Sequence, residues 1–224
     1  MRYHTIATDY DGTLAADGQV DDNTWAAISS FRDRGGKVLL VTGREFEDLQ
    51  QVCPELRRFD AVIAENGGVV YWPDSDSVMP QGERPPEAFQ QRLRERGVDP
   101  IRCGRVIMAT WQPHGHQVET VILDMQLPYH VILNKRAVMI LPVGVDKAST
   151  LKRVLGDLNI APDDTIAIGD AENDISLLEV CGLGVAVDNA LPAVKAIADY
   201  VTTGSRGDGV QDLIHKLLED KLDL

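Results

Sequence analysis

Cysteine is scarce in this chain, and its few copies lie far apart. Cys53, Cys103 and Cys181 are the three cysteines among 224 residues, and no Cys-x-x-Cys pair occurs. Small domains that depend on disulfides carry many cysteines, and cysteine-based zinc sites need pairs at short spacing. The sequence therefore excludes a disulfide framework and a cysteine-based zinc site.

Basic residues and long apolar runs are also lacking. Lys and Arg number 22 against 35 Asp and Glu, which gives a formal net charge of −13. This balance argues against a broad surface for nucleic acid or an anionic membrane, although a bound metal still allows a small anionic substrate. No apolar stretch approaches the ~20 residues of a membrane helix, and the N-terminus has no basic segment followed by an apolar run. We therefore expect a cytoplasmic protein without nucleic-acid or membrane partners, and protein partners stay open.

What the chain does contain is an alternation of strand-like and helix-like segments, with hydrophobic residues at 44%. Strands are expected at 3–9, 37–41, 61–64 and 69–72, with helical segments near 25–31 and 45–52. The alternation resumes with a helix near 151–158, strands at 165–169, 184–187 and 200–203, and helices at 174–180, 191–198 and 210–218. Such alternation favours an α/β fold in which helices cover a parallel sheet.

The middle of the chain departs from this pattern. The segment 73–86 holds four prolines and several Asp, Ser and Gly residues, which indicates a linker. It is followed by a charged helix near 86–97, a strand at 106–110, a helix near 115–126 and strands at 129–134 and 137–142. We therefore predict a core of residues 1–81 and 144–224 with an inserted α/β subdomain at 82–143. Lys135 and Arg136 fall between the last two strands, where a solvated hairpin turn is expected and contact with a substrate anion is the alternative.

Two carboxylates stand where the first strand ends, in Asp9-Tyr10-Asp11-Gly12-Thr13-Leu14. Positions i and i+2 of a strand share a face, so Asp9 and Asp11 converge if the strand geometry continues that far. Two close carboxylates repel each other, and a divalent cation or a shared proton relieves the repulsion. The pair suggests metal-assisted phosphoryl transfer.

Three further polar clusters follow a strand or open a helix. Thr42-Gly43-Arg44 offers a hydroxyl, a backbone amide and a guanidinium to phosphate oxygens, and Asp146-Lys147 places an ammonium at a helix start. Asp170, Glu172 and Asp174 supply the oxygen ligands that magnesium prefers. Any one of these clusters is ordinary as a turn or a helix cap. Together, each at a strand end where α/β folds bind ligands, they indicate one site.

With these motifs in place, the chain resembles the haloacid dehalogenase superfamily phosphatases of subfamily IIB, which carry an inserted α/β cap. The matching positions are Asp9 to Leu14, Thr42, Lys147, Gly169 to Asp174, and the segment Glu65-Asn66-Gly67-Gly68. The resemblance spans nearly the whole chain and is specific in the core and loose in the cap. It implies a Rossmann-like parallel-sheet core at 1–81 and 144–224 and a cap at 82–143.

The resemblance also implies a role for each residue. Asp9 is the expected nucleophile, which forms an aspartyl-phosphate. Asp11 is the expected general acid and base. Thr42 and Lys147 are expected to bind phosphoryl oxygens. Asp9, Asp11 through its backbone carbonyl, Asp170 and Asp174 are the expected Mg²⁺ ligands. Gly43, Arg44, Asn66 and Asn173 are expected on the substrate side.

The expected activity is Mg²⁺-dependent hydrolysis of a small phosphorylated metabolite, either a sugar phosphate or a phosphoglycolate-like acid. Two alternatives stay open. A phosphomutase would return the phosphoryl group to its substrate. A phospho-Asp signalling or binding module would keep the group on Asp9 without turnover. Asp11 separates the last alternative from an enzyme, because rapid dephosphorylation needs an acid and base.

Overall fold

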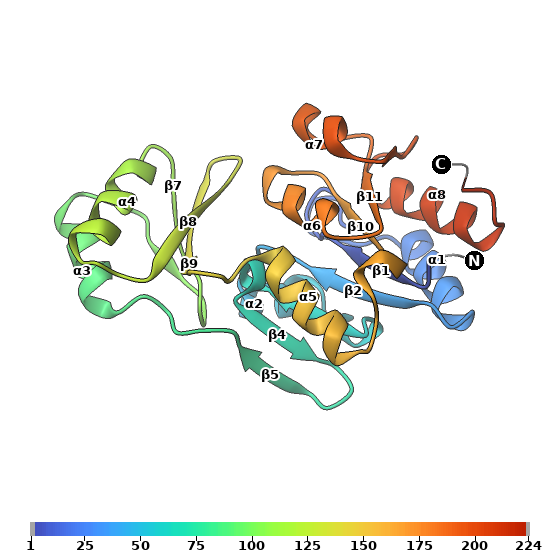
Figure 1. The fold of residues 1–224 in the computed structure, drawn as a ribbon, viewed down its shortest axis with the longest axis horizontal. Coiled ribbons are helices and arrows are strands. Elements are labelled where there is room, and N and C mark those ends of the chain that lie inside the picture. Colours follow the sequence, from blue (N-terminus) through green and yellow to red (C-terminus); the bar gives the residue numbers. More distant parts are fainter. Residues whose placement is uncertain (1–2, 223–224) are drawn as a thin grey trace.

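The computed structural model describes residues 3–222 and contains two β-sheets (Figure 1). The larger sheet has eight strands in the order β12-β11-β10-β1-β2-β3-β4-β5. Its strands are β1 (Thr5–Thr8), β2 (Lys37–Val41), β3 (Ala61–Ala64), β4 (Val69–Trp72), β5 (Ser77–Pro80), β10 (Thr165–Gly169), β11 (Leu183–Ala186) and β12 (Tyr200–Val201). All neighbours from β12 to β3 run parallel, whereas β4 and β5 run antiparallel to their neighbours. This confirms the predicted α/β fold with a parallel sheet.

Helices cover this sheet, as the alternating sequence predicts. They are α1 (Asp22–Asp33), α2 (Phe46–Val52), α5 (Lys147–Asp157), α6 (Ile175–Glu179), α7 (Pro192–Ile197) and α8 (Gly207–Leu218). Helices α5, α6 and α7 are neighbours in a row, and α1 packs against α8. The central strands are buried along their whole length, so apolar runs such as Val38–Val41 form the core.

The register of the central strands brings distant parts of the chain to one edge. Thr8, the last residue of β1, pairs with Leu40 of β2 and with Ile168 of β10. Asp9 therefore leaves β1 at the level where β2 and β10 also end. The segments after three strands meet there, as expected at the carboxyl edge of a parallel sheet.

The smaller sheet lies to one side of the larger one (Figure 1). It has four antiparallel strands in the order β6-β7-β9-β8. Its elements are α3 (Glu87–Glu95), β6 (Arg102–Cys103), β7 (Met108–Trp111), α4 (Gly115–Asp124), β8 (Tyr129–Asn134) and β9 (Ala137–Pro142). A separate apolar cluster joins α3 and α4 to the sheet through residues such as Phe89, Val118 and Ile140. All these elements fall within residues 82–143, although the domain boundaries themselves stay a prediction.

The prediction of a linker at 73–86 is wrong, because the segment contains β5. Val78 of β5 pairs with Tyr71 of β4, and β5 forms the edge of the larger sheet. We interpreted Pro80 as a sign of a linker, but an edge strand also tolerates proline. The two-residue strand β6 was also not predicted. Within residues 3–222, no helix combines the length and apolar character needed to cross a membrane.

Candidate active site

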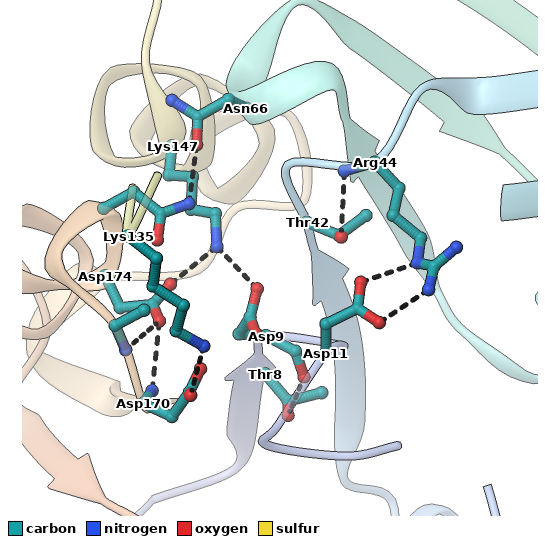
Figure 2. Close-up of polar contacts among 12 residues, drawn as sticks. Thr8, Asp9, Asp11, Thr42, Arg44, Asn66, Lys135, Lys147, Asp170 and Asp174 are labelled. Carbon is teal, nitrogen blue, oxygen red and sulfur yellow. Dashed lines mark hydrogen bonds and ion pairs between the residues drawn. The ribbon is translucent and has the colours of Figure 1, made fainter. Parts of the chain in front are cut away.

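The site is organised around the buried ammonium of Lys147, at the first position of α5. Asp146 caps this helix: its carboxylate accepts the Ser149 backbone N–H, and the Ser149 hydroxyl accepts the Asp146 N–H. This capping box fixes the first helical turn. Lys147 Nζ lies 2.6 Å from Asp9 Oδ1 and 2.6 Å from Asp174 Oδ1, with 1% of the side chain exposed (Figure 2).

Asp170 and Asp174 come from the tight turn that follows β10. Oδ2 of Asp174 accepts the backbone N–H groups of Asp170 and Ala171, both at 3.0 Å. A Cβ atom on Gly169 would lie 2.5 Å from the Asp174 Cβ, so only glycine permits this turn. The turn thereby holds two carboxylates beside Asp9.

Asp9, Asp170 and Asp174 each offer a carboxylate oxygen, and these atoms lie within 4.8 Å of one another. Oδ1 of Asp170 is buried and has no hydrogen-bond partner within residues 3–222. A buried carboxylate oxygen without a partner is costly, and a hard cation with oxygen ligands relieves that cost. The arrangement therefore fits a divalent metal ion. Gly12 permits the close approach, since a Cβ there would meet Asp170 Oδ2 at 2.7 Å.

The environment of this cluster raises the pKa values of both Asp9 and Lys147. Burial and the neighbouring Asp174 charge outweigh the attraction of Lys147 and raise the pKa of Asp9 from 3.8 to about 8. Burial lowers the pKa of Lys147, but Asp174 and Asp9 more than offset this and hold it above its ordinary value. Lys147 therefore stays charged, and Asp9 needs further positive charge to be fully ionised at neutral pH.

Asp11 points away from the acidic cluster and pairs with Arg44 (Figure 2). Arg44 Nε and Nη2 lie 2.6 and 2.7 Å from the two Asp11 oxygens, and Nη1 lies 2.6 Å from Asp48 Oδ2. The pairing with Asp11 raises the pKa of Arg44 further above its ordinary value. Arg44 was expected to contact substrate, but its guanidinium is already bound by two carboxylates here.

The remaining predicted residues lie on the loops after β2 and β3 and in the turn after β10. The Thr42 hydroxyl is buried and accepts the Arg44 backbone N–H at 3.2 Å. The Asn66 backbone N–H donates to the Thr42 carbonyl, and the Asn66 side-chain oxygen accepts from Asn173 Nδ2 at 3.0 Å. Asn66 has φ 54°, a conformation that asparagine adopts more readily than most residues. These hydrogen bonds connect the segments that follow β2, β3 and β10.

A cavity of about 270 Å³ opens in front of these groups. On the side of the larger sheet, the residues that follow β1, β2 and β10 line it: Asp9, Asp11, Thr42, Gly43, Arg44, Asp170 and Asn173. Asn134, Lys135 and Met139 line it from the smaller sheet. Seven of the ten predicted site residues thus line one cavity, and the smaller sheet contributes the residues on its other side. The other three, Lys147, Asn66 and Asp174, each form a hydrogen bond with one of the lining residues.

Lys135 lies in an exposed turn, as the sequence predicts, but its ammonium makes a contact that was not predicted. The turn between β8 and β9 does expose half of the side chain, but Nζ lies 3.0 Å from Asp170 Oδ2. The contact spans two sheets, so no local sequence signal indicates it. Arg136, its neighbour, is exposed as predicted.

Glu65 also forms contacts that its motif, Glu65-Asn66-Gly67-Gly68, did not indicate. Its side chain is fully buried, and its carboxylate accepts the backbone N–H groups of Arg105, Val106 and Ile107 at 2.8, 2.8 and 2.9 Å. A Cβ on Gly104 would lie 2.5 Å from Glu65 Oε1. A carboxylate at the end of β3 thus holds the segment that leads into β7.

Comparison with known proteins agrees with this geometry. Residues 6–94 and 129–214 match the sequence pattern of haloacid dehalogenase-like hydrolases. A phosphoglycolate phosphatase of Halorubrum lacusprofundi is 33% identical, with 95% of this chain and 96% of that protein aligned.

Solved structures show the same fold. A haloacid dehalogenase-like hydrolase from Bacteroides thetaiotaomicron superposes with a TM-score of 0.82 at 21% identity, covering 96% of this chain and 99% of the other. A sugar phosphatase of haloacid dehalogenase subclass IIB gives a TM-score of 0.77 at 19% identity, covering 95% and 98%. The predicted α/β architecture is thereby confirmed.

Proposed function

Because the chain belongs to the haloacid dehalogenase-like hydrolase family, as its motifs predict, we propose that it is a metal-dependent phosphatase. Its substrate is a small phosphate monoester, and the reaction passes through an aspartyl-phosphate on Asp9. The observation that carries the proposal is the Lys147 ammonium, 2.6 Å from an oxygen of Asp9 and of Asp174. A fixed cation beside a nucleophilic carboxylate favours phosphoryl transfer, because it offsets charge in the transition state.

We assign Mg²⁺ to the acidic cluster, with Asp9 and Asp170 as carboxylate ligands. The backbone carbonyl of Asp11 completes the set, and Asp174 contributes directly or through water. The ion, when bound, neutralises phosphoryl oxygens and favours the ionised form of Asp9. The oxygen-only donor set and the unpartnered Asp170 Oδ1 support this choice.

In the first half-reaction, a carboxylate oxygen of Asp9 attacks phosphorus, and the bond between phosphorus and the leaving oxygen breaks. Asp11 donates a proton to that oxygen, so the alcohol leaves neutral. The Thr42 hydroxyl and Lys147 bind the oxygens of the transferred group. Both Asp11 oxygens accept hydrogen bonds from Arg44 in this structure, so Asp11 has to leave this pair before it can carry a proton to the leaving oxygen.

In the second half-reaction, Asp11 takes a proton from a water molecule, whose oxygen attacks the phosphorus of the aspartyl-phosphate. The bond from phosphorus to Asp9 breaks, inorganic phosphate leaves, and the Asp9 carboxylate is restored. The two steps sum to hydrolysis of a phosphate monoester. Residues of both sheets line the cavity, and this supports the sequence because less bulk water reaches the intermediate than on an open surface.

Phosphoglycolate is the first candidate substrate. The support is the named activity of the Halorubrum relative, 33% identical across nearly the whole chain. A cavity of about 270 Å³ accepts a ligand of that size. Sugar phosphates are the second candidate, supported by the fold of the subclass IIB sugar phosphatase.

The test is a panel of phosphoglycolate, sugar phosphates and p-nitrophenyl phosphate, assayed for released inorganic phosphate with Mg²⁺ and with chelator. Mg²⁺-dependent release over many turnovers is expected. Isomerised substrate without released phosphate would identify a phosphomutase. Release of no more than one phosphate per chain would identify a phospho-Asp module. Release unaffected by chelator would contradict the metal assignment.

A further inference from the structure

The turn between β8 and β9 contacts the loop that carries Asp170 at two points. The backbone N–H of Lys135 donates to Glu172 Oε2 at 3.1 Å, and its ammonium lies 3.0 Å from Asp170 Oδ2. Figure 1 shows this hairpin reaching from the smaller sheet toward the larger one, and Figure 2 shows the ammonium above Asp170. The hairpin of the smaller sheet thus places the Lys135 ammonium beside Asp170, a carboxylate of the acidic cluster.

Lys135 differs from the other cations near the cavity in how firmly it is held. Lys147 is buried and bonded to two carboxylates, and the Arg44 guanidinium is bonded to Asp11 and Asp48. The Lys135 side chain is 51% exposed, and within residues 3–222 its ammonium forms one ion pair, with Asp170. A half-exposed ammonium with one carboxylate partner moves at small cost.

Asp170 is also one of the carboxylates that we assign to the metal. A divalent cation bound there repels the ammonium of Lys135 and competes for the charge of the same carboxylate. A substrate phosphate in the cavity offers the displaced ammonium a new anionic partner, because Lys135 lines that cavity.

We propose that Lys135 is an anion-binding residue of the smaller sheet, held by Asp170 in the metal-free protein and released to the substrate when the metal binds. The inference rests on the proposed function. It predicts two effects of opposite sign: removing the ammonium strengthens metal binding and weakens phosphate binding. A variant that only made the hairpin more mobile would strengthen neither metal binding nor phosphate binding.

The test compares Lys135→Met with Arg136→Met, a control in the same exposed turn whose side chain forms no hydrogen bond or ion pair with the cluster within residues 3–222. Calorimetric titration of each protein with Mg²⁺ alone should show about two- to fivefold tighter binding in Lys135→Met, the range of a partly exposed ion pair. Titration with inorganic phosphate at saturating Mg²⁺ should show about tenfold weaker binding in the same variant. Arg136→Met should match the wild type in both titrations.

An Mg²⁺ affinity that does not tighten, or a phosphate affinity that does not weaken, overturns the inference. Both titrations report binding and need no turnover. Mg²⁺-dependent phosphate release by the wild-type protein is measured separately, so the proposed function can stand while this inference fails.

Discussion

The Lys147 ammonium bridges Asp9 and Asp174, with 2.6 Å to one oxygen of each carboxylate. All three side chains are buried, although they come from the end of β1, the start of α5 and the turn after β10. The ammonium therefore compensates two charges that would otherwise repel each other in a medium of low dielectric constant.

Lys147→Ala should destabilise the protein strongly. The variant leaves two buried carboxylates without their cation, and breaking such an arrangement costs about 3–5 kcal/mol of unfolding free energy. Chemical denaturation of the metal-free proteins measures this. Lys152→Ala, on the exposed face of the same helix, should change stability by less than about 0.5 kcal/mol. Similar losses for both variants would contradict the bridging role.

The raised pKa of Asp9 predicts that metal binding depends on pH. Burial, reinforced by Asp174, holds this pKa at about 8 in the metal-free protein, and a metal ligand must be ionised. Mg²⁺ affinity should therefore rise with pH up to about pH 8 and then level off, with a proton released on binding below about pH 8. Calorimetry in buffers of different ionisation enthalpy measures both quantities. A pH-independent affinity with no proton release would count against this titration.

The same shift has a consequence for the stability of the metal-free protein. The folded-state pKa of Asp9 lies above the unfolded value, so between the two the folded state binds more protons. The contribution of Asp9 to stability is therefore largest at low pH and declines as pH rises from about 4 to about 8. Unfolding in chelator across that range measures the slope. Asp9→Asn should show a smaller decline.

Asp11→Asn should reduce the rate of both half-reactions. Loss of a general acid and base costs about 10²–10⁴-fold in kcat, and the deficit in the first step should be smallest for p-nitrophenyl phosphate, whose leaving group needs little protonation. Steady-state kinetics on that ester and on phosphoglycolate provide the comparison. Equal deficits in the rate of the first step on both esters would argue against the acid role.

Glu65→Ala should destabilise the protein and loosen the segment before β7. The variant removes the acceptor of three backbone N–H groups, those of residues 105–107. We expect a loss of about 2–4 kcal/mol in unfolding free energy and faster amide exchange at those positions.

Glu47→Gln is the matched control for Glu65→Ala. It removes a partly exposed ion pair with Arg105, on the same segment, and should cost less than about 1 kcal/mol. Amide exchange at residues 105–107 that is unchanged in Glu65→Ala would show that the carboxylate does not hold this segment.

The sequence predicts that residues at the ends of neighbouring strands lie close together, and the structure shows this arrangement. Asp9, Thr42 and Asp170 each follow an apolar strand, and parallel strands that pair in register bring such positions together. The Lys147 position follows from the Asp146 cap, which is a local signal.

The contacts that escaped prediction are those made across the two sheets. Lys135 reaches Asp170 and Glu65 reaches Arg105 only after the smaller sheet has packed against the larger one. The Asp11–Arg44 pair depends on side-chain direction at the loop after β2, which residue spacing does not determine. Strand β5 was missed for another reason, since proline is compatible with an edge strand as well as a linker.

The central claim is that Asp9 carries the phosphoryl group during turnover. Rapid acid quench of Asp11→Asn with p-nitrophenyl phosphate and Mg²⁺, followed by peptide mass spectrometry, tests it directly, because this ester largely spares the first step while the variant hydrolyses the intermediate slowly. The mechanism predicts one phosphoryl group on the peptide that contains Asp9, and none when Asp9→Asn is combined with Asp11→Asn. A phosphoryl group on another residue, or phosphate release at the wild-type rate by a folded Asp9→Asn protein, would contradict it.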